Sequence, residues 1–149
     1  MSRANRPFLI GWVASWLKGR HKAPAKNGDA GARHLAVGRI GERAACRELW
    51  KRGYRILERN FRCTEGEIDI ICEKHCIVYF VEVKTRTGPD GAADAAIEAV
   101  DEDKRRRLRS AARTYLSRFD AEGLEVRFKV LTVALDERLK PCRVEVFED

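Results

Sequence analysis

The spacing of apolar residues along this chain alternates between a helical period and short continuous runs. From Leu35 to Arg52, small and apolar residues recur every three or four positions and Gly53 follows, which predicts an amphipathic helix that ends at the glycine. The stripe expected to face the core comprises Leu35, Gly38, Glu42, Ala45, Cys46 and Leu49. The opposite side of this helix carries Arg39, Arg43, Arg47 and Lys51.

Runs rich in β-branched and aromatic residues predict five strands, over residues 54–62, 66–71, 77–84, 125–135 and 143–147. Only a few polar residues separate the second run from the third. We therefore expect these two runs to form a hairpin, with Glu73, Lys74 and His75 in a tight turn. A turn near Pro141 is expected to join the last two strands.

Between the third and fourth strands the pattern becomes helical again. A turn over residues 88–91 precedes a short Ala-rich helix through Val100, and a longer helix opens at Asp101 or Glu102, where acids suit the positive end of the helix dipole. Its expected inner stripe comprises Lys104, Leu108, Ala111, Ala112 and Tyr115. Its largely outward residues are expected to be Arg105, Arg106, Arg109 and Arg113. This succession of elements predicts an α/β fold.

Composition narrows the class of protein. A chain of 149 residues with 44% hydrophobic and 36% charged residues has room for one compact, soluble domain. The net charge of +7 suggests nucleic acid as a partner, but residues 1–33 hold seven basic residues and one acid and so carry +6 of it. A binding face on the domain must therefore come from clustering of charge.

The first 33 residues are predicted to form a basic, flexible extension and linker, outside a single domain at residues 34–149. The apolar run from Phe8 to Leu17 is too short to span a bilayer, and Lys22 to Ala32 is typical of a linker. An amphipathic segment that touches a membrane surface or a partner is the alternative to a poorly ordered extension.

Five cysteines form no paired CxxC motifs, so a zinc site would lack its second ligand pair. Reduced, partly buried thiols in a cytoplasmic protein are the preferred interpretation. The cysteines are Cys46, Cys63, Cys72, Cys76 and Cys142.

The predicted hairpin carries the candidate chemistry. Folding it back brings Asp69, near the start of one strand, beside Glu82, near the end of the next. Because strand side chains alternate between faces, Glu82 and Lys84 point to one side and Val83 to the other. Two carboxylates and an ammonium therefore converge at the end of an apolar sheet. Without a metal ion, the acids should repel each other and raise the pKa of at least one.

This group of charges suits metal-assisted hydrolysis of phosphodiesters. Hard divalent cations prefer carboxylate oxygens and retain several waters, so one or two acids suffice to bind them. A nearby lysine can orient the attacking water or bond a phosphate oxygen. The alternative is a surface hairpin with an ordinary Glu82–Lys84 pair. Glu42 lies in the core-facing helical stripe, where a carboxylate needs a metal, a proton, or a backbone or arginine partner.

With Glu42 included, the chain resembles the YraN-like family of small bacterial proteins, which is assigned to the PD-(D/E)XK nuclease superfamily. The resemblance covers roughly residues 35–147. The motifs that carry it are Gly38-x-x-Gly41-Glu42 with Ala45, Leu49 and Gly53, then Arg59-Asn60-Phe61-Arg62, Gly66-Glu67-Ile68-Asp69, Phe80-Val81-Glu82-Val83-Lys84-x-Arg86, Ala99-Val100, Lys104 and Arg127-Phe128.

The resemblance implies a restriction-endonuclease-like core, with a mixed sheet of about five strands flanked by helices, close to that of Holliday junction resolvases. It implies catalytic roles for Glu42, Asp69, Glu82 and Lys84. The implied ligands of Mg²⁺ or Mn²⁺ are Asp69, Glu82, the Val83 carbonyl and Glu42, and Glu42 has the alternative role of positioning water. The residues expected to contact phosphates are Arg59, Arg62, Arg86, Lys104, Arg105, Arg106 and Arg109.

The function expected from the sequence is a metal-dependent endonuclease that cuts DNA, with branched or damaged structures as candidate substrates. The expected partner is DNA rather than RNA, with no membrane span and with a homodimer as an open alternative. A non-catalytic nucleic-acid-binding or scaffold protein that keeps the fold is the alternative function. This chain departs from the family at Lys129, where an acid is usual, so a secondary acidic contact is expected to be lost.

Overall fold

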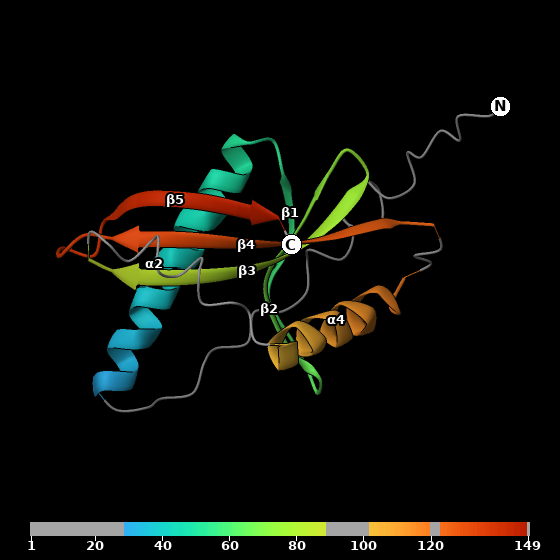
Figure 1. Ribbon diagram of the computed structural model, residues 1–149, viewed down its shortest axis with the longest axis horizontal. Helices are drawn as coiled ribbons and strands as arrows, with labels where there is room; N and C mark the ends of the chain where they lie inside the picture. Colours follow the sequence, from blue (N-terminus) through green and yellow to red (C-terminus); the bar gives the residue numbers. More distant parts are fainter. Residues whose placement is uncertain (1–28, 89–101, 120–122, 149) are drawn as a thin grey trace.

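The computed structural model describes residues 29–88, 102–119 and 123–148. Within them, five strands form one sheet that lies between two helices (Figure 1). The elements in chain order are α2 (Asp29–Lys51), β1 (Arg55–Cys63), β2 (Gly66–Lys74), β3 (Ile77–Thr87), α4 (Glu102–Leu116), β4 (Glu125–Leu135) and β5 (Pro141–Glu148). The predicted N-terminal extension up to residue 28 and the Ala-rich helix before Val100 lie outside the described residues.

The strands follow one another across the sheet in sequence order, from β1 to β5. All neighbours pair antiparallel except β3 and β4, which run parallel in continuous register from Ile77–Glu125 to Thr87–Leu135. The α4 segment makes the connection that a parallel pair requires. The predicted α/β fold with a mixed five-stranded sheet is therefore confirmed.

The sheet buries apolar side chains on both faces, and each face has its own helix. On one face α4 packs on β1 and β2, where Phe61, Ile71 and Phe80 meet Ala111 and Tyr115. On the other face α2 crosses β3, β4 and β5, with its buried stripe against the second apolar cluster. The buried side chains of β3 alternate between the two clusters, with Val78 and Phe80 in the first and Tyr79 and Val81 in the second.

Helix α2 ends as the sequence predicts but begins earlier. Its last turn closes at Gly53, whose φ of 82° is the left-handed conformation that a glycine adopts without strain. The Gly53 N–H donates to the Trp50 carbonyl at 2.9 Å, and the Tyr54 N–H to that of Leu49 at 3.0 Å. The helix begins at Asp29. The linker predicted over residues 22–32 is therefore wrong from residue 29 onward.

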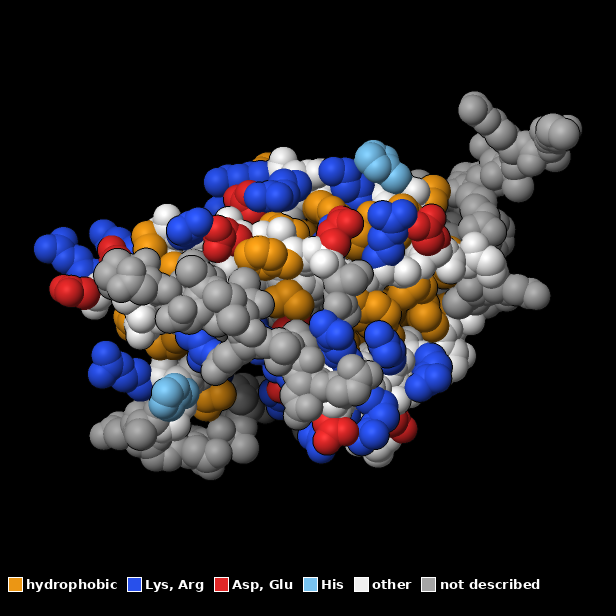
Figure 2. All heavy atoms as spheres, viewed as in Figure 1, with side chains coloured by type: hydrophobic (Ala, Val, Ile, Leu, Met, Phe, Trp, Pro, Cys, Tyr) orange, Lys and Arg blue, Asp and Glu red, His pale blue; other side chains and the backbone are white. Residues whose placement is uncertain are grey.

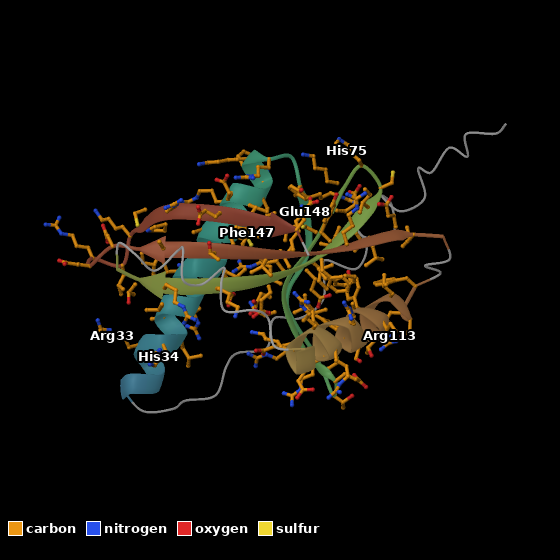
Figure 3. All side chains as sticks on the ribbon, in the orientation of Figure 1. Arg33, His34, His75, Arg113, Phe147 and Glu148 are labelled. Atoms are coloured by element: carbon orange, nitrogen blue, oxygen red, sulfur yellow. The ribbon has the colours of Figure 1, made fainter. Side chains whose placement is uncertain are left out.

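The predicted β2–β3 turn is displaced along the chain, whereas the turn predicted near Pro141 is present. The β2–β3 turn consists of His75 and Cys76, with φ values of 53° and 64°, because Lys74 still pairs with Ile77. Figure 3 shows His75 at the tip of this hairpin. The β4–β5 turn precedes Pro141, which is the first residue of β5. Asp136 closes that turn with its carboxylate and main-chain groups.

Two further expectations concern thiols and membranes. All five cysteines are free thiols, as predicted, and burial raises the pKa of the Cys72 thiol to about 12. Among the described residues, neither helix combines the length and the apolar character that a bilayer crossing requires.

Helix α2 and strand β3 come into very close contact at Gly41 and Thr85. A Cβ atom built at Gly41 would lie 2.8 Å from the Thr85 Cβ and 2.9 Å from its Cγ2, closer than unbonded carbons approach. Only a residue without a side chain therefore allows the helix to cross the strand at this height. The next helical residue is Glu42, so this contact sets how deeply that carboxylate reaches.

Replacing Gly41 tests the contact. We expect Gly41→Ala to lower the free energy of unfolding by about 1–3 kcal/mol, because the added methyl group forces α2 and β3 apart. Gly38→Ala is the matched control in the same helix, since nothing lies within 4 Å of a Cβ there. That control should be neutral or stabilising by up to about 1 kcal/mol. Equal effects of the two substitutions in urea unfolding would contradict the close contact.

Candidate active site

The candidate site lies where strands β2 and β3 stop pairing. Their recorded register ends at Ile70 and Val81, and beyond it the N–H of Val83 donates to Oδ2 of Asp69 at 2.7 Å. A side-chain carboxylate thus occupies the place of a main-chain acceptor. Asp69 and Glu82 are the next residues after the last pair, one on each strand. Burial and, next, the charge of Glu82 raise the pKa of Asp69, so the two carboxylates lie near each other, while their projection to one face stays a prediction.

Glu82 faces α4 and is ion-paired with it. Its carboxylate is in contact with the ammonium group of Lys104, in the first turn of that helix. The Glu82 side chain is only 12% exposed, whereas the Lys104 side chain is 48% exposed. A half-exposed cation thus neutralises a largely buried anion. The sequence assigned Lys104 to phosphate contacts and did not reveal this pairing.

Glu42 reaches the site from α2 and is held there by β1. The side-chain amide of Asn60 donates to Glu42 Oε2 at 2.9 Å, and the Arg59 guanidinium lies 3.7 Å from the same oxygen. Asn60 has a φ of 53°, a left-handed conformation that asparagine tolerates better than most residues. The arginine partner that the sequence left open for Glu42 is therefore present, together with an amide that it did not reveal.

The electrostatics of Asp69 tie the three acids together. Burial raises the pKa of Asp69, the charges of Glu82 and Glu42 add to the shift and the Val83 N–H opposes it, with a net pKa of about 7. The expectation that crowded acids raise at least one pKa is confirmed. The ionised form of Asp69 is thus disfavoured, and a bound cation at this point would relieve that cost.

Lys84 lies two residues beyond Glu82 and on the same face of β3. It is half-buried, and no side chain among the described residues forms an ion pair or hydrogen bond with it. Its neighbour in the parallel register is Thr132, whose buried hydroxyl oxygen also has no partner among the described residues. On the part of the chain that the structure describes, Lys84 thus offers an ammonium and Thr132 a hydroxyl next to Glu82 in the sheet, both without side-chain partners there.

The acids do not form a ready-made metal cage. Among the described residues, no group of three or more His, Cys, Asp or Glu side chains is arranged to hold a metal ion. Glu42 bonds Asn60 instead of meeting the other two carboxylates in such a group. The structure therefore brings Asp69 close to Glu82, and the roles of Lys84 and Glu42 at a metal stay predictions.

The residues predicted to contact phosphates differ in their surroundings. The set comprises Arg59, Arg62, Arg86, Lys104, Arg105, Arg106 and Arg109. Arg62 pairs with Glu67 at 3.2 Å and Arg106 with Asp103 at 2.8 Å, both in exposed positions. Arg105 is half-buried, so its expected outward position is wrong. Their contacts with nucleic acid stay predictions.

Lys129, the departure from the family pattern, lies on the α2 side of the sheet, away from Glu82. It is 2% exposed, pairs with Glu148, and its ammonium lies 4.8 Å from the centroid of the Tyr79 ring. Figure 3 shows Glu148 at the end of β5. An acid at position 129 would thus contact this aromatic cluster and not the carboxylates of the site.

The family profile and the individual relatives that this chain matches all carry the same family description. The profile of the uncharacterised protein family UPF0102 matches residues 41–133. A UPF0102 protein of Moorella thermoacetica is 43% identical over 111 residues, which is 74% of this chain and 91% of the relative. A UPF0102 protein of Pelotomaculum thermopropionicum is 41% identical over 120 residues, 80% of this chain and 98% of the relative. One of Koribacter versatilis is 49% identical over 110 residues, 72% of this chain and 74% of the relative.

The raised pKa of Asp69 predicts an unusual pH dependence of stability. Its folded-state pKa of about 7 exceeds the ordinary value of 3.8, so the stability it contributes is complete below 3.8 and is lost as pH rises through about 7. Asp69→Asn keeps an acceptor for the Val83 N–H but removes the charge. We expect this variant to gain about 1–3 kcal/mol over the wild type as pH rises from about 5 to about 8.

Urea unfolding at both pH values measures this gain. Glu137→Gln, at an exposed acid of the β4–β5 turn that does not act on the pKa of Asp69, controls for the simple loss of one negative charge. A stability difference between Asp69→Asn and wild type that stays constant with pH would contradict the crowding of acids at this site.

Proposed function

The chain belongs to the uncharacterised protein family UPF0102, and because that description names no activity, we propose from the site that it is a metal-dependent endonuclease of DNA. The observation that carries the proposal is the Asp69 carboxylate, held by the Val83 N–H beside Glu82 where two strands separate. Two carboxylates crowded at the end of an apolar sheet destabilise each other, so their placement needs a reason beyond folding.

The donor atoms suit a hard divalent cation. Asp69 and Glu82 would hold Mg²⁺ or Mn²⁺ together with the Val83 carbonyl, since such ions bind through one or two carboxylates and complete their shell with water and substrate phosphates. A cation already lies against Glu82, in the form of the Lys104 ammonium. The pKa of Asp69 near 7 points the same way, because a nearby positive charge favours its ionised form.

The bound metal would supply an activated water and charge stabilisation at the phosphate. The remaining steps fall to side chains of this chain. Lys84, without a protein partner among the described residues, is available to orient the attacking water and to bond a non-bridging phosphate oxygen. Glu42, fixed by Asn60, is placed to accept a hydrogen bond from a water that approaches the same point.

DNA is the substrate that best accounts for the exposed basic residues near these acids. Arg59 lies next to Glu42, and Arg62 and Arg86 lie exposed on the two strands that flank the site. Such side chains contact backbone phosphates and position the duplex without selecting its sequence. Branched or damaged DNA follows from the resemblance to Holliday junction resolvases.

A second candidate, a nucleic-acid-binding protein without catalysis, has one observation in its favour. Glu82 and Glu42 already have cationic partners in Lys104 and Arg59, and no third acid completes a metal group among the described residues. In that case the only role of the acids would be to attach α4 and β1 to the rest of the domain through these ion pairs. The two experiments below separate the candidates.

Lys84→Ala separates catalysis from binding. We expect cleavage of branched DNA with Mg²⁺ or Mn²⁺ to fall by about 10²–10³-fold, because one charge beside the scissile phosphate is lost while both carboxylates stay. Metal affinity, measured by calorimetry without DNA, should be unchanged. Lys140→Ala, at an exposed lysine of the β4–β5 turn, is the control. Wild-type protein that binds DNA tightly but cuts no substrate with either metal would establish the second candidate.

Lys104→Met tests whether a metal competes with the ion pair on Glu82. Removing the ammonium should tighten the binding of Mg²⁺ in the absence of DNA by about two- to fivefold, the worth of a half-exposed ion pair. Glu82→Gln should abolish the binding measured in the same titration. If Lys104→Met leaves the dissociation constant unchanged while Glu82→Gln abolishes binding, the ion pair has no part in metal binding.

A further inference from the structure

The outer face of α2 carries a row of basic residues that the proposed nuclease chemistry leaves unused. These residues, called here the α2 basic stripe, are Arg39, Arg43, Arg47 and Lys51. All four are exposed, and no other described residue forms a side-chain ion pair or hydrogen bond with any of them. Figure 2 shows Lys and Arg side chains, with Asp and Glu among them, along the upper edge of the molecule, while the outer face of α2 lies behind the sheet in this view.

The spacing of the stripe works against the helix that carries it. Its members follow one another at intervals of four residues, about 6 Å along the axis, so each repels the next. The acids of this part of the helix do not relieve the repulsion: Glu42 bonds Asn60, and Glu48 pairs with Arg52 at 2.8 Å. A row of unneutralised like charges is what a polyanion requires of its binding surface.

One large aromatic residue lies in the same row. Trp50 is 73% exposed and falls within about 20° of Arg39 and of Arg43 around the helix axis. Its neighbour Leu49 is fully buried, so the helix has no lack of apolar side chains for its core contact. An exposed indole beside cationic side chains is suited to stacking against an unpaired base.

The stripe lies on the same helix as Glu42, one of the three acids of the candidate site. Arg43 is the next residue after Glu42, whose carboxylate lies 3.7 Å from the Arg59 guanidinium. A nucleic-acid strand bound along the stripe would follow α2 from Arg39 toward Trp50.

We propose that the α2 basic stripe and Trp50 bind a single-stranded stretch of the nucleic-acid substrate, with Trp50 stacking on an unpaired base. The arginines contact the phosphates of this stretch, and the indole distinguishes unpaired bases from a closed duplex, whose bases already stack on one another. The inference rests on the proposed function for the class of substrate. It makes a substrate with an unpaired strand next to the cleavage point the preferred one.

Trp50 reports on this contact directly. The full chain holds three tryptophans, so Trp12→Phe and Trp16→Phe leave Trp50 as the single tryptophan, which is excited selectively over the tyrosines at the red edge of the absorption band. The Asp69→Asn substitution and EDTA exclude cleavage. We expect short oligothymidylate and oligouridylate to quench Trp50 fluorescence, the matching duplex to quench it weakly, and poly-glutamate not to quench it.

Substitutions assign the contacts. Trp50→Ala should weaken the binding of oligothymidylate by about tenfold or more, and Trp50→Phe should restore most of it. Replacing Arg39, Arg43 and Arg47 with Gln should make the slope of log affinity against log salt shallower by about 2. The same charge change at Arg138, Lys140 and Arg143, around the β4–β5 turn, should leave the slope unchanged. The melting temperature of the variant that lacks Arg39, Arg43 and Arg47 should stay the same or rise, because like charges no longer repel along α2.

Equal binding of oligothymidylate by wild type and by the two α2 variants would overturn the proposal and leave the row a solvated face. Quenching by poly-glutamate as strong as by oligonucleotide would also overturn it, in favour of an acidic protein partner. Both outcomes are measured without metal and without cleavage. They are therefore independent of whether the protein proves to be a nuclease.

Discussion

The hydrogen bond from the Val83 N–H to the Asp69 carboxylate determines where strands β2 and β3 separate, and the candidate site depends on that separation. Up to Ile70 and Val81, the main chain satisfies its own donors and acceptors. Beyond that point an acid completes the pairing, which fixes one of its oxygens in the sheet and brings it beside Glu82. A neutral side chain of the same shape would satisfy the N–H equally well, so the charge on Asp69 serves something other than the sheet.

The two helices supply the rest of the site by different means. The contact between Gly41 and Thr85 fixes α2 against β3, so packing determines how close the Glu42 carboxylate lies to the sheet. Lys104 arrives on the exposed first turn of α4 and meets Glu82 through a flexible side chain. One acid is thus held rigidly, whereas the ammonium is free to exchange its anionic partner. That difference suits a site in which protein groups stay in place while counter-ions are replaced.

The sequence predicted those parts of the site that depend on local geometry. Asp69 lies near Glu82 because a short hairpin brings strands β2 and β3 together. The contact of Lys104 was not predictable, since it depends on the path of the whole crossover from β3 to α4. The hydrogen bond from Asn60 to Glu42 was not predictable either. An asparagine within a strand-like run is nevertheless a sign of a residue in the left-handed conformation. The start of α2 at Asp29 was missed because Ala, Gly and Lys are also typical of linkers.

The sheet order has a consequence for how the molecule folds. Strands β1 to β3 form a meander and β4 and β5 a hairpin, so both units are built from contacts between chain neighbours. Among the strand pairings, only the parallel β3–β4 pairing joins distant parts of the chain. Closing the long connection between these two strands costs conformational entropy, so we expect this pairing to form slowly. Asp69 and Val83 are 14 positions apart, within the first unit. The carboxylate geometry can therefore form before the two halves of the sheet meet, and the late step of folding adds support to a site that is already shaped.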